Sequence, residues 1–282
     1  MPTIIDLNAE AAKLTTSDGL PATTTTKRKG RVAHLGAYRD GILILGTSTG
    51  TGPGHWETHP EDELVHILAG TRTLEIVCDD GPPRSFELRA GTIAVIPQGA
   101  WHRFRSVGFG LVMSATIPGE HVELDVDDPR PHARAPSGEG HRASGSPRIS
   151  DLGRELATLT MFRRSPAATA ADRAGSVAEL APYRDGLLLA IKASGTDHWE
   201  RHLTGDELVH VLDGAATLEI VCDDGPPQAF PLRAGMIAVI PQGAWHRLLS
   251  PEGFAQIAVT PFPGETIERD VHDPRLVERK PA

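Results

Sequence analysis

The chain has 282 residues and a formal net charge of −9 at neutral pH. Neutralising phosphates requires clustered Lys and Arg, so this charge argues against nucleic-acid binding. No apolar stretch is long enough to cross a bilayer, and residues 1–14 lack the basic start and apolar centre of a signal peptide. We therefore expect a cytoplasmic protein that contacts no membrane.

Most of the expected elements are short strands. Runs rich in β-branched and large apolar residues, separated by Gly, Pro and Asp, predict strands at Ile42–Leu45, Thr71–Cys78, Phe86–Leu88 and Ile93–Ile96. The second half of the chain mirrors each of them. Helical patterns occur only at Leu7–Leu14, at Leu152–Met161 and after Pro118. Many short strands at close spacing indicate an all-β sandwich or barrel, whose closed interior can hold one small ligand or ion.

The chain contains an internal duplication. Leu74–Arg103 and Leu218–Arg247 differ at only four positions. The period is far longer than a solenoid or propeller unit, so each copy is expected to be a domain with its own core. Residues 131–147 are rich in Pro, Gly and Ser and lack apolar periodicity, which predicts a linker. The expected domains are therefore residues 1–130 and 148–282.

Two histidines and two glutamates recur in the duplication. They are Glu57, His59, Glu63 and His102 in the first copy and Glu200, His202, Glu207 and His246 in the second. Residues two apart in a strand share a face, so Glu57 and His59 should point the same way. A turn follows, Glu63 opens the next strand, and His102 arrives after a Pro-Gln-Gly turn. We expect three ligands from one hairpin and a fourth from a distant strand, gathered around a cation inside a barrel.

These motifs resemble those of the cupin superfamily, G-x5-H-x-H-x3,4-E-x6-G and G-x5-P-x-G-x2-H-x3-N. The intervals from Glu63 to Gly70 and from Gly91 to His102 are kept, and the second copy keeps them too. The chain thus looks like a bicupin. The resemblance implies tandem cupin β-barrels, or jelly rolls, with short flanking helices, and it implies that each recurring His and Glu63 or Glu207 bind metal. Departures are Glu57 and Glu200 at the family's first His, and Ser106 and Ser250 at its final Asn.

A shell of two His and two Glu favours Fe, Mn, Ni or Zn over Cu(I), and the shell alone does not choose among them. His55 and His198 offer an alternative. Each lies two residues upstream of the glutamate and on the same strand face, so either could replace it as a ligand. Glu57 or Glu200 would then be free to act as a base.

Three functions fit this pattern. The favoured one is a metal-dependent dioxygenase of a small organic substrate, phenolic or a diketone, with one divalent metal per barrel and Glu57, Glu63, Glu200 and Glu207 as candidate bases. The second is a metal-dependent isomerase or lyase of a sugar or carboxylate, although two carboxylates would repel a dianion such as oxalate. The third is a metal- or metabolite-binding bicupin without turnover. A homodimer is a further expectation, because stacked barrels commonly pair.

Overall fold

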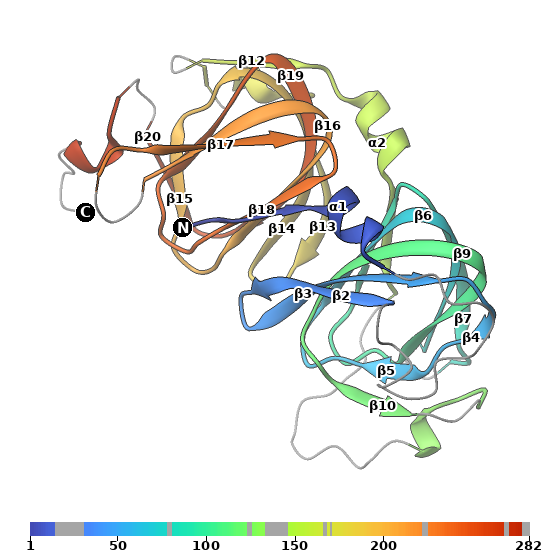
Figure 1. The fold of residues 1–282 in the computed structure, drawn as a ribbon. Coiled ribbons are helices and arrows are strands. Elements are labelled where there is room, and N and C mark those ends of the chain that lie inside the picture. Colours follow the sequence, from blue (N-terminus) through green and yellow to red (C-terminus); the bar gives the residue numbers. More distant parts are fainter. Residues whose placement is uncertain are drawn as a thin grey trace. The chain divides into compact units, whose positions relative to one another are not determined.

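The computed structural model describes residues 1–14, 31–77, 81–122, 126–132, 146–165, 168–169, 171–221, 225–267 and 271–277. The chain divides into two compact units. One comprises residues 9–152, and the other residues 1–8 with 153–282. We call them the N-terminal barrel and the C-terminal barrel. Within the described residues each is built on a sheet of ten strands, and two short helices accompany them, so the all-β fold is confirmed (Figure 1).

The N-terminal barrel contains β2 to β11. Their bounds are β2 Val32–Tyr38, β3 Gly41–Ser48, β4 Thr51–Pro53, β5 Trp56–Thr58, β6 Glu63–Ile76, β7 Arg84–Arg89, β8 Thr92–Ile96, β9 His102–Thr116, β10 Glu120–Val122 and β11 Arg148–Asp151. The main path of the sheet runs β10-β5-β9-β6-β8-β11, with β3 and β4 on β9, β2 on β3 and β7 on β6. A short 3-10 helix follows at Arg130–His132.

The C-terminal barrel contains β1 and β12 to β20. Their bounds are β1 Thr3–Asp6, β12 Phe162–Arg164, β13 Val177–Tyr183, β14 Gly186–Thr196, β15 Trp199–His202, β16 Glu207–Ile220, β17 Gln228–Arg233, β18 Met236–Ile240, β19 His246–Pro261 and β20 Gly264–Ile267. The main path runs β1-β18-β16-β19-β14-β12, with β13 on β14, β17 on β16, and β15 between β19 and β20. Two 3-10 helices, Ala171–Arg173 and Pro274–Leu276, flank these strands.

Each barrel encloses its own apolar core, built from repeat-matched residues. Leu74 and Ile76 on β6 are fully or almost fully buried, and so are their counterparts Leu218 and Ile220 on β16. Burying one such side chain contributes about 1.5–3 kcal/mol. In β3 buried and half-buried residues alternate along the strand, as a sheet with one face on the core requires. Each barrel thus has a buried apolar cluster of its own within the described residues.

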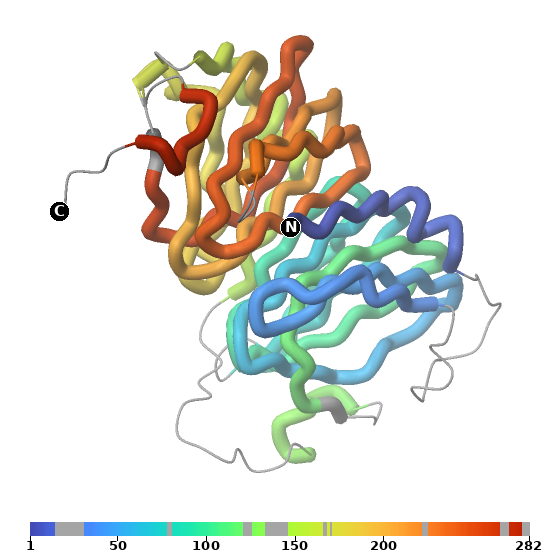
Figure 2. Tube along the Cα trace, turned by 60° about the vertical axis from the view of Figure 1, so that its left-hand side comes forward, coloured from blue at the N-terminus to red at the C-terminus, as the bar shows by residue number. Residues whose placement is uncertain are grey.

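Each unit includes an edge strand that lies outside its own sequence repeat. β1, at the start of the chain, pairs antiparallel with β18, and β11, from the middle of the chain, pairs with β8 (Figures 1 and 2). The backbone N–H of Leu7 donates to Gly235, and that of Leu152 donates to Gly91. This pairing differs from the domain bounds expected from sequence, 1–130 and 148–282. The backbone groups along the outer edges of β8 and β18 need hydrogen-bond partners. Any extended segment can supply these partners, so the sequence does not show which segment will pair there. Residues 133–145 of the expected linker lie outside the described residues.

The helices begin where expected. α1 spans Leu7–Ala12 and α2 spans Leu152–Thr158. The helix expected after Pro118 is wrong, because Glu120–Val122 forms β10, paired with β5. That pairing brings Gly119 so close to the Thr58 carbonyl that a Cβ atom there would overlap it. The strand expected to end at Cys78 ends at Ile76, and Cys78 lies outside the described residues. None of the described helices has the length and apolar character to cross a membrane.

Candidate metal centre

Three neighbouring strands position the recurring side chains in the N-terminal barrel. Glu57 on β5 lies directly opposite His102, the first residue of β9. Glu63 opens β6, and His59 follows β5 without interruption. β9 lies between β5 and β6 in the sheet, so the expected hairpin between those two strands is wrong. The four side chains come together because β9 pairs with both β5 and β6, a long-range pairing that spacing along the chain does not reveal.

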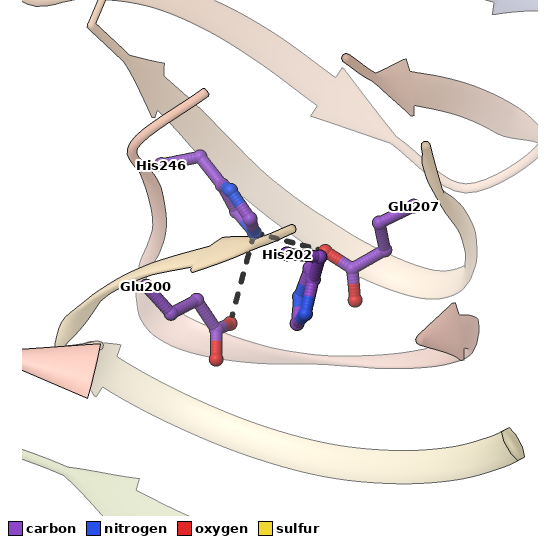
Figure 3. A group of neighbouring side chains, drawn as sticks. All are labelled: Glu200, His202, Glu207 and His246. Atoms are coloured by element: carbon purple, nitrogen blue, oxygen red, sulfur yellow. Dashed lines mark ion pairs between the residues drawn. The ribbon is translucent and has the colours of Figure 1, made fainter. Parts of the chain in front are cut away.

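The C-terminal barrel repeats this arrangement. Glu200 on β15 lies opposite His246 at the start of β19, and Glu207 opens β16. His202 is the last residue of β15. Figure 3 shows the four side chains pointing toward one another from these strands. The duplicated pattern in the sequence is therefore a duplicated arrangement in space.

The distances within the two groups agree closely. Nε2 of His102 lies 2.9 Å from Glu63 Oε2 and 3.8 Å from Glu57 Oε1. In the other barrel Nε2 of His246 lies 2.9 Å from Glu207 Oε2 and 3.8 Å from Glu200 Oε1. The second histidine lies 3.6 Å from Glu63 Oε2 in the N-terminal barrel and 3.5 Å from Glu207 Oε2 in the C-terminal barrel.

Four of the side chains offer donor atoms that lie within 4.8 Å of one another in the C-terminal barrel, and three do so in the N-terminal barrel. These sets are Glu200, His202, Glu207 and His246, and Glu57, His59 and His102. Glu63 joins the second set through its contacts with both histidines. Both sets have the spacing of groups that surround one ion.

Backbone carbonyls orient three of the four recurring histidines. Nδ1 of His59, His102 and His246 lies within 2.8–3.1 Å of the carbonyls of Ile117, Ala100 and Ala244. A carbonyl only accepts, so each Nδ1 carries a proton, and once the ring is neutral its Nε2 offers a lone pair.

These lone pairs point into the groups. In the neutral ring, Nε2 of all four recurring histidines is buried and has no hydrogen-bond partner for its lone pair among the described residues. Buried polar atoms are rarely left unpaired. Imidazoles that a carbonyl orients, beside carboxylates, are common ligands of transition-metal ions. The donor set fits a divalent transition metal.

Electrostatic interactions shift the pKa values of the two glutamates of the C-terminal barrel in opposite directions. Desolvation favours the neutral form of Glu207, but hydrogen bonding and attraction from His202 and His246 outweigh it and hold the pKa of Glu207 below its ordinary value. Burial opposes the charged form of His246, yet contact with Glu207 raises the pKa of His246 to about 9. Desolvation, with repulsion from Asp197 and Glu207, raises the pKa of Glu200. One glutamate is thus held ionised while the other is poised to bind a proton.

The structure does not bring His55 or His198 into either group. Both lie just before β5 or β15, where the alternation of strand faces does not apply. His55 is half-buried, and His198 is buried against Arg173, with Nδ1 3.1 Å from Arg173 Nη2. His66 and His210 are also buried, on β6 and β16.

A cavity of about 490 Å³ adjoins the group in the C-terminal barrel. Glu200, His202 and Glu207 line it, together with Arg164 and Arg173. Neither arginine was expected at the site, because both come from the segment before β13, which lies far from the motifs in sequence. The sequence holds one signal of this difference. Immediately before the motif, the second copy has the charged Asp197 where the first copy has Gly54.

Known proteins resemble parts of this chain. Residues 44–114 match the cupin domain family. A structure of Bacillus subtilis oxalate decarboxylase concerned with its Mn(II) centres matches with a TM-score of 0.51 and 11% identity, over 84% of this chain and 74% of that one. The same enzyme at pH 4.6 matches with a TM-score of 0.51 and 11% identity, over 84% and 73%. At this identity the likeness concerns the fold.

No curated protein matches the chain. The family match covers β-strands of the N-terminal barrel, and the structural matches extend over most of the chain. The C-terminal barrel repeats the motifs of the N-terminal one. The cupin resemblance inferred from the motifs is thereby supported, and its extension to a bicupin rests on the internal repeat.

Proposed function

We propose that the chain is a metal-dependent oxygenase that acts on a small organic substrate in the cavity of the C-terminal barrel. The observation that carries this proposal is the set of His202, His246 and Glu207, two imidazoles and one carboxylate converging beside a cavity. Such a set, with open positions, is typical of non-haem iron oxygenases. Glu200 stands at its edge as a fourth, less buried donor.

Each residue has a role in this proposal. His202, His246 and Glu207 hold the ion, which when bound supplies Lewis-acid and redox chemistry. Thr260 donates a hydrogen bond of 2.8 Å from its hydroxyl to Glu207 Oε1, which leaves Oε2 directed at the histidines. This bond fixes the carboxylate so that only one of its oxygens takes part in binding.

Glu200 is the proposed proton acceptor. Its side chain is 31% exposed and lines the cavity, so a substrate can reach it. A raised pKa makes its carboxylate a better base than an ordinary glutamate. A phenol or an enolisable diketone must lose a proton to bind as an anion, and Glu200 is placed to take it. Glu57 occupies the matching position in the N-terminal barrel.

The cavity favours an organic substrate over water. Leu189, Ile191, Val209 and Leu248 form apolar walls beside the polar group. Apolar walls with a few convergent polar groups are typical of small-molecule sites. A cavity of about 490 Å³ also has room for a ring-sized molecule, far more than a two-carbon dianion needs.

A Lewis-acid lyase or isomerase is the second candidate. The observation that favours it is the fold shared with oxalate decarboxylase. Two glutamates beside the ion weaken the case for a dianionic substrate, because like charges repel in a desolvated site.

Metal analysis of freshly purified protein, followed by oxygen-consumption assays with phenols, diketones and flavonols, tests the proposal. Iron, manganese or nickel with oxygen uptake is expected, and uptake should disappear in His202→Ala/His246→Ala. Zinc as the only metal, with no uptake on any substrate, would overturn the oxygenase proposal in favour of the second candidate or of a binding protein. A cytoplasmic location and a homodimer stay predictions.

A further inference from the structure

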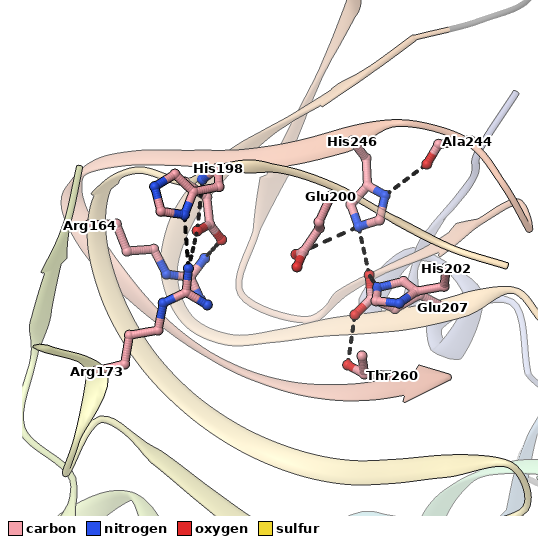
Figure 4. Close-up of polar contacts among 10 residues, drawn as sticks. Arg164, Arg173, His198, Glu200, His202, Glu207, Ala244, His246 and Thr260 are labelled. Carbon is pink, nitrogen blue, oxygen red and sulfur yellow. Dashed lines mark hydrogen bonds and ion pairs between the residues drawn. The ribbon is translucent and has the colours of Figure 1, made fainter. Parts of the chain in front are cut away.

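We propose that the C-terminal barrel contains an anion-binding subsite, centred on Arg173, that takes the carboxylate of the substrate. We call Glu200, His202, Glu207 and His246 the metal group of this barrel. The subsite lies in the cavity that the first three of them line, so a molecule can reach both. Figure 4 shows Arg164, Arg173 and His198 gathered on one side and Glu200, His202 and His246 on the other. This inference deepens the proposed function by naming the chemical class of its substrate.

Arg164 is held in place by an unusually enclosed ion pair. Its Nη1 contacts Asp197 Oδ2, and the two side chains are only 9% and 6% exposed. Its buried Nε has no hydrogen-bond partner among the described residues, although Arg164 lines the cavity. A buried arginine is normally satisfied on all its donors, so the free Nε indicates a ligand that accepts hydrogen bonds.

Arg173 lies beside this pair and is more accessible. Its side chain is 34% exposed, and its Nη2 lies 3.1 Å from His198 Nδ1 and 3.9 Å from Asp197 Oδ1. Its Nε is buried and likewise unpaired within the described part of the chain. A guanidinium always donates, so His198 Nδ1 accepts this hydrogen bond.

Charge counting then gives the cluster a net positive charge. Arg164 and Arg173 each carry +1 and Asp197 carries −1, so one positive charge is left over. The apolar walls of the cavity keep the local dielectric low, which strengthens attraction for an anion. Guanidinium groups match carboxylates in geometry and bind them through paired hydrogen bonds.

The N-terminal barrel lacks a key part of this cluster. Gly54 stands at the repeat position of Asp197, and it cannot hold an arginine side chain. Arg28, at the repeat position of Arg173, lies outside the described residues. Within the described residues the charged cluster is therefore found in the C-terminal barrel alone, whereas the metal group is common to both.

The two ends of the cavity define the substrate. One end offers the metal group, which suits a phenolic or enolic oxygen, and the other offers a guanidinium, which suits a carboxylate. Apolar residues such as Leu189 and Ile191 line the space around them. The class that fits is an organic monocarboxylate with an apolar body and a second oxygen remote from the carboxylate.

Calorimetric titration of the metal-loaded protein without oxygen tests the subsite. The probes are 4-hydroxybenzoate and its neutral isostere 4-hydroxybenzamide. Wild-type protein should bind the acid about tenfold or more tightly than the amide, as expected for a charge-assisted pair. Arg173→Gln should abolish this preference without changing metal content. Arg163→Gln is the matched control: Arg163 is the exposed neighbour on β12, and its removal should leave the preference intact.

Arg173→Lys provides a second variant if Arg173→Gln does not fold. It keeps the charge and loses the planar fork, so the acid should bind severalfold more weakly than to wild type. Equal binding of acid and amide by the wild type, or an unchanged preference in the folded Arg173 variants, would overturn the subsite. This binding test is done without oxygen, so its outcome does not depend on turnover. A failure to detect oxygen uptake in the separate oxygen-consumption assays would overturn the oxygenase proposal and leave the subsite standing.

Discussion

The two barrels carry the same metal group in different surroundings. The distance from the strand-opening histidine to its nearer glutamate is 2.9 Å in both, and to its farther glutamate 3.8 Å in both. Around this shared centre, Asp197, Arg164 and Arg173 form a charged cluster in the C-terminal barrel, whereas the N-terminal barrel has Gly54 in place of Asp197. Ligand geometry was retained in both copies while the adjoining surface diverged.

This difference separates two demands on a binding site. Holding a metal requires ligand side chains at fixed spacing, and any departure costs affinity in both copies alike. Recognising a substrate requires groups beyond the ligands, and one copy can change them without losing its ion. The shared part of the barrels should therefore respond equally to matched substitutions, and the diverged part should not.

The largest expected effect comes from removing ligands in one barrel at a time. His59→Ala/His102→Ala should strip the metal from the N-terminal barrel and halve the metal content per chain, because the ion loses both of its histidine ligands. His202→Ala/His246→Ala should halve it likewise, and it alone should abolish oxygen uptake. Elemental analysis of the purified variants measures this, and unchanged metal content would refute the ligand assignment.

Matched core substitutions test whether the shared scaffold is equally stable. Leu74→Ala and Leu218→Ala each remove a fully buried side chain at the same repeat position. Each should destabilise its own barrel by about 2–5 kcal/mol, through lost burial and the cavity left behind. Denaturant unfolding of both variants provides the comparison. A large loss in one and none in the other would show that the cores are not equivalent.

Acid should destabilise the N-terminal barrel through His66. Desolvation lowers the pKa of this buried imidazole from 6.5 to about 4, and its strand partners Ile93 and Met113 are apolar. The unfolded chain binds the proton first, so stability is complete above pH 6.5 and falls as the pH drops toward 4. The loss should reach about 3 kcal/mol.

Denaturant midpoints measured from pH 7 to pH 4 check this sign and size. His66→Asn, which cannot titrate, is the control and should flatten part of the slope. A slope identical in wild type and His66→Asn would assign the acid sensitivity to other groups.

The smallest effect is the proton balance of metal binding. The pKa of His246 is raised to about 9 by Glu207, so without metal this imidazole is protonated at pH 7.5. Metal binding needs the neutral ring and should displace about one proton from it. Calorimetry in buffers with different ionisation enthalpies counts the protons released. Zero release at pH 7.5 would contradict the pairing of His246 with Glu207.

The repeat, the short strands and the recurring His and Glu positions are all readable in the sequence, because side-chain type and local spacing carry that information. Leu74–Arg103 and its copy have matched strands because the same apolar pattern drives both. The expectation for the segment after Pro118 was wrong, since its pairing with β5 outweighed a weak local preference.

What the sequence determined by itself was the kind of chemistry: duplicated domains, each with two imidazoles and two carboxylates at fixed intervals. Tertiary structure decided which strands bring them together. β9 lies between β5 and β6 in the sheet. β1 and β11 each complete a sheet by pairing with a strand that is distant in the chain. β12 and Ala171–Arg173 place the two arginines at the cavity. Those outcomes depend on backbone hydrogen bonding between distant segments, which is nearly independent of side-chain identity and therefore leaves little trace in a single sequence.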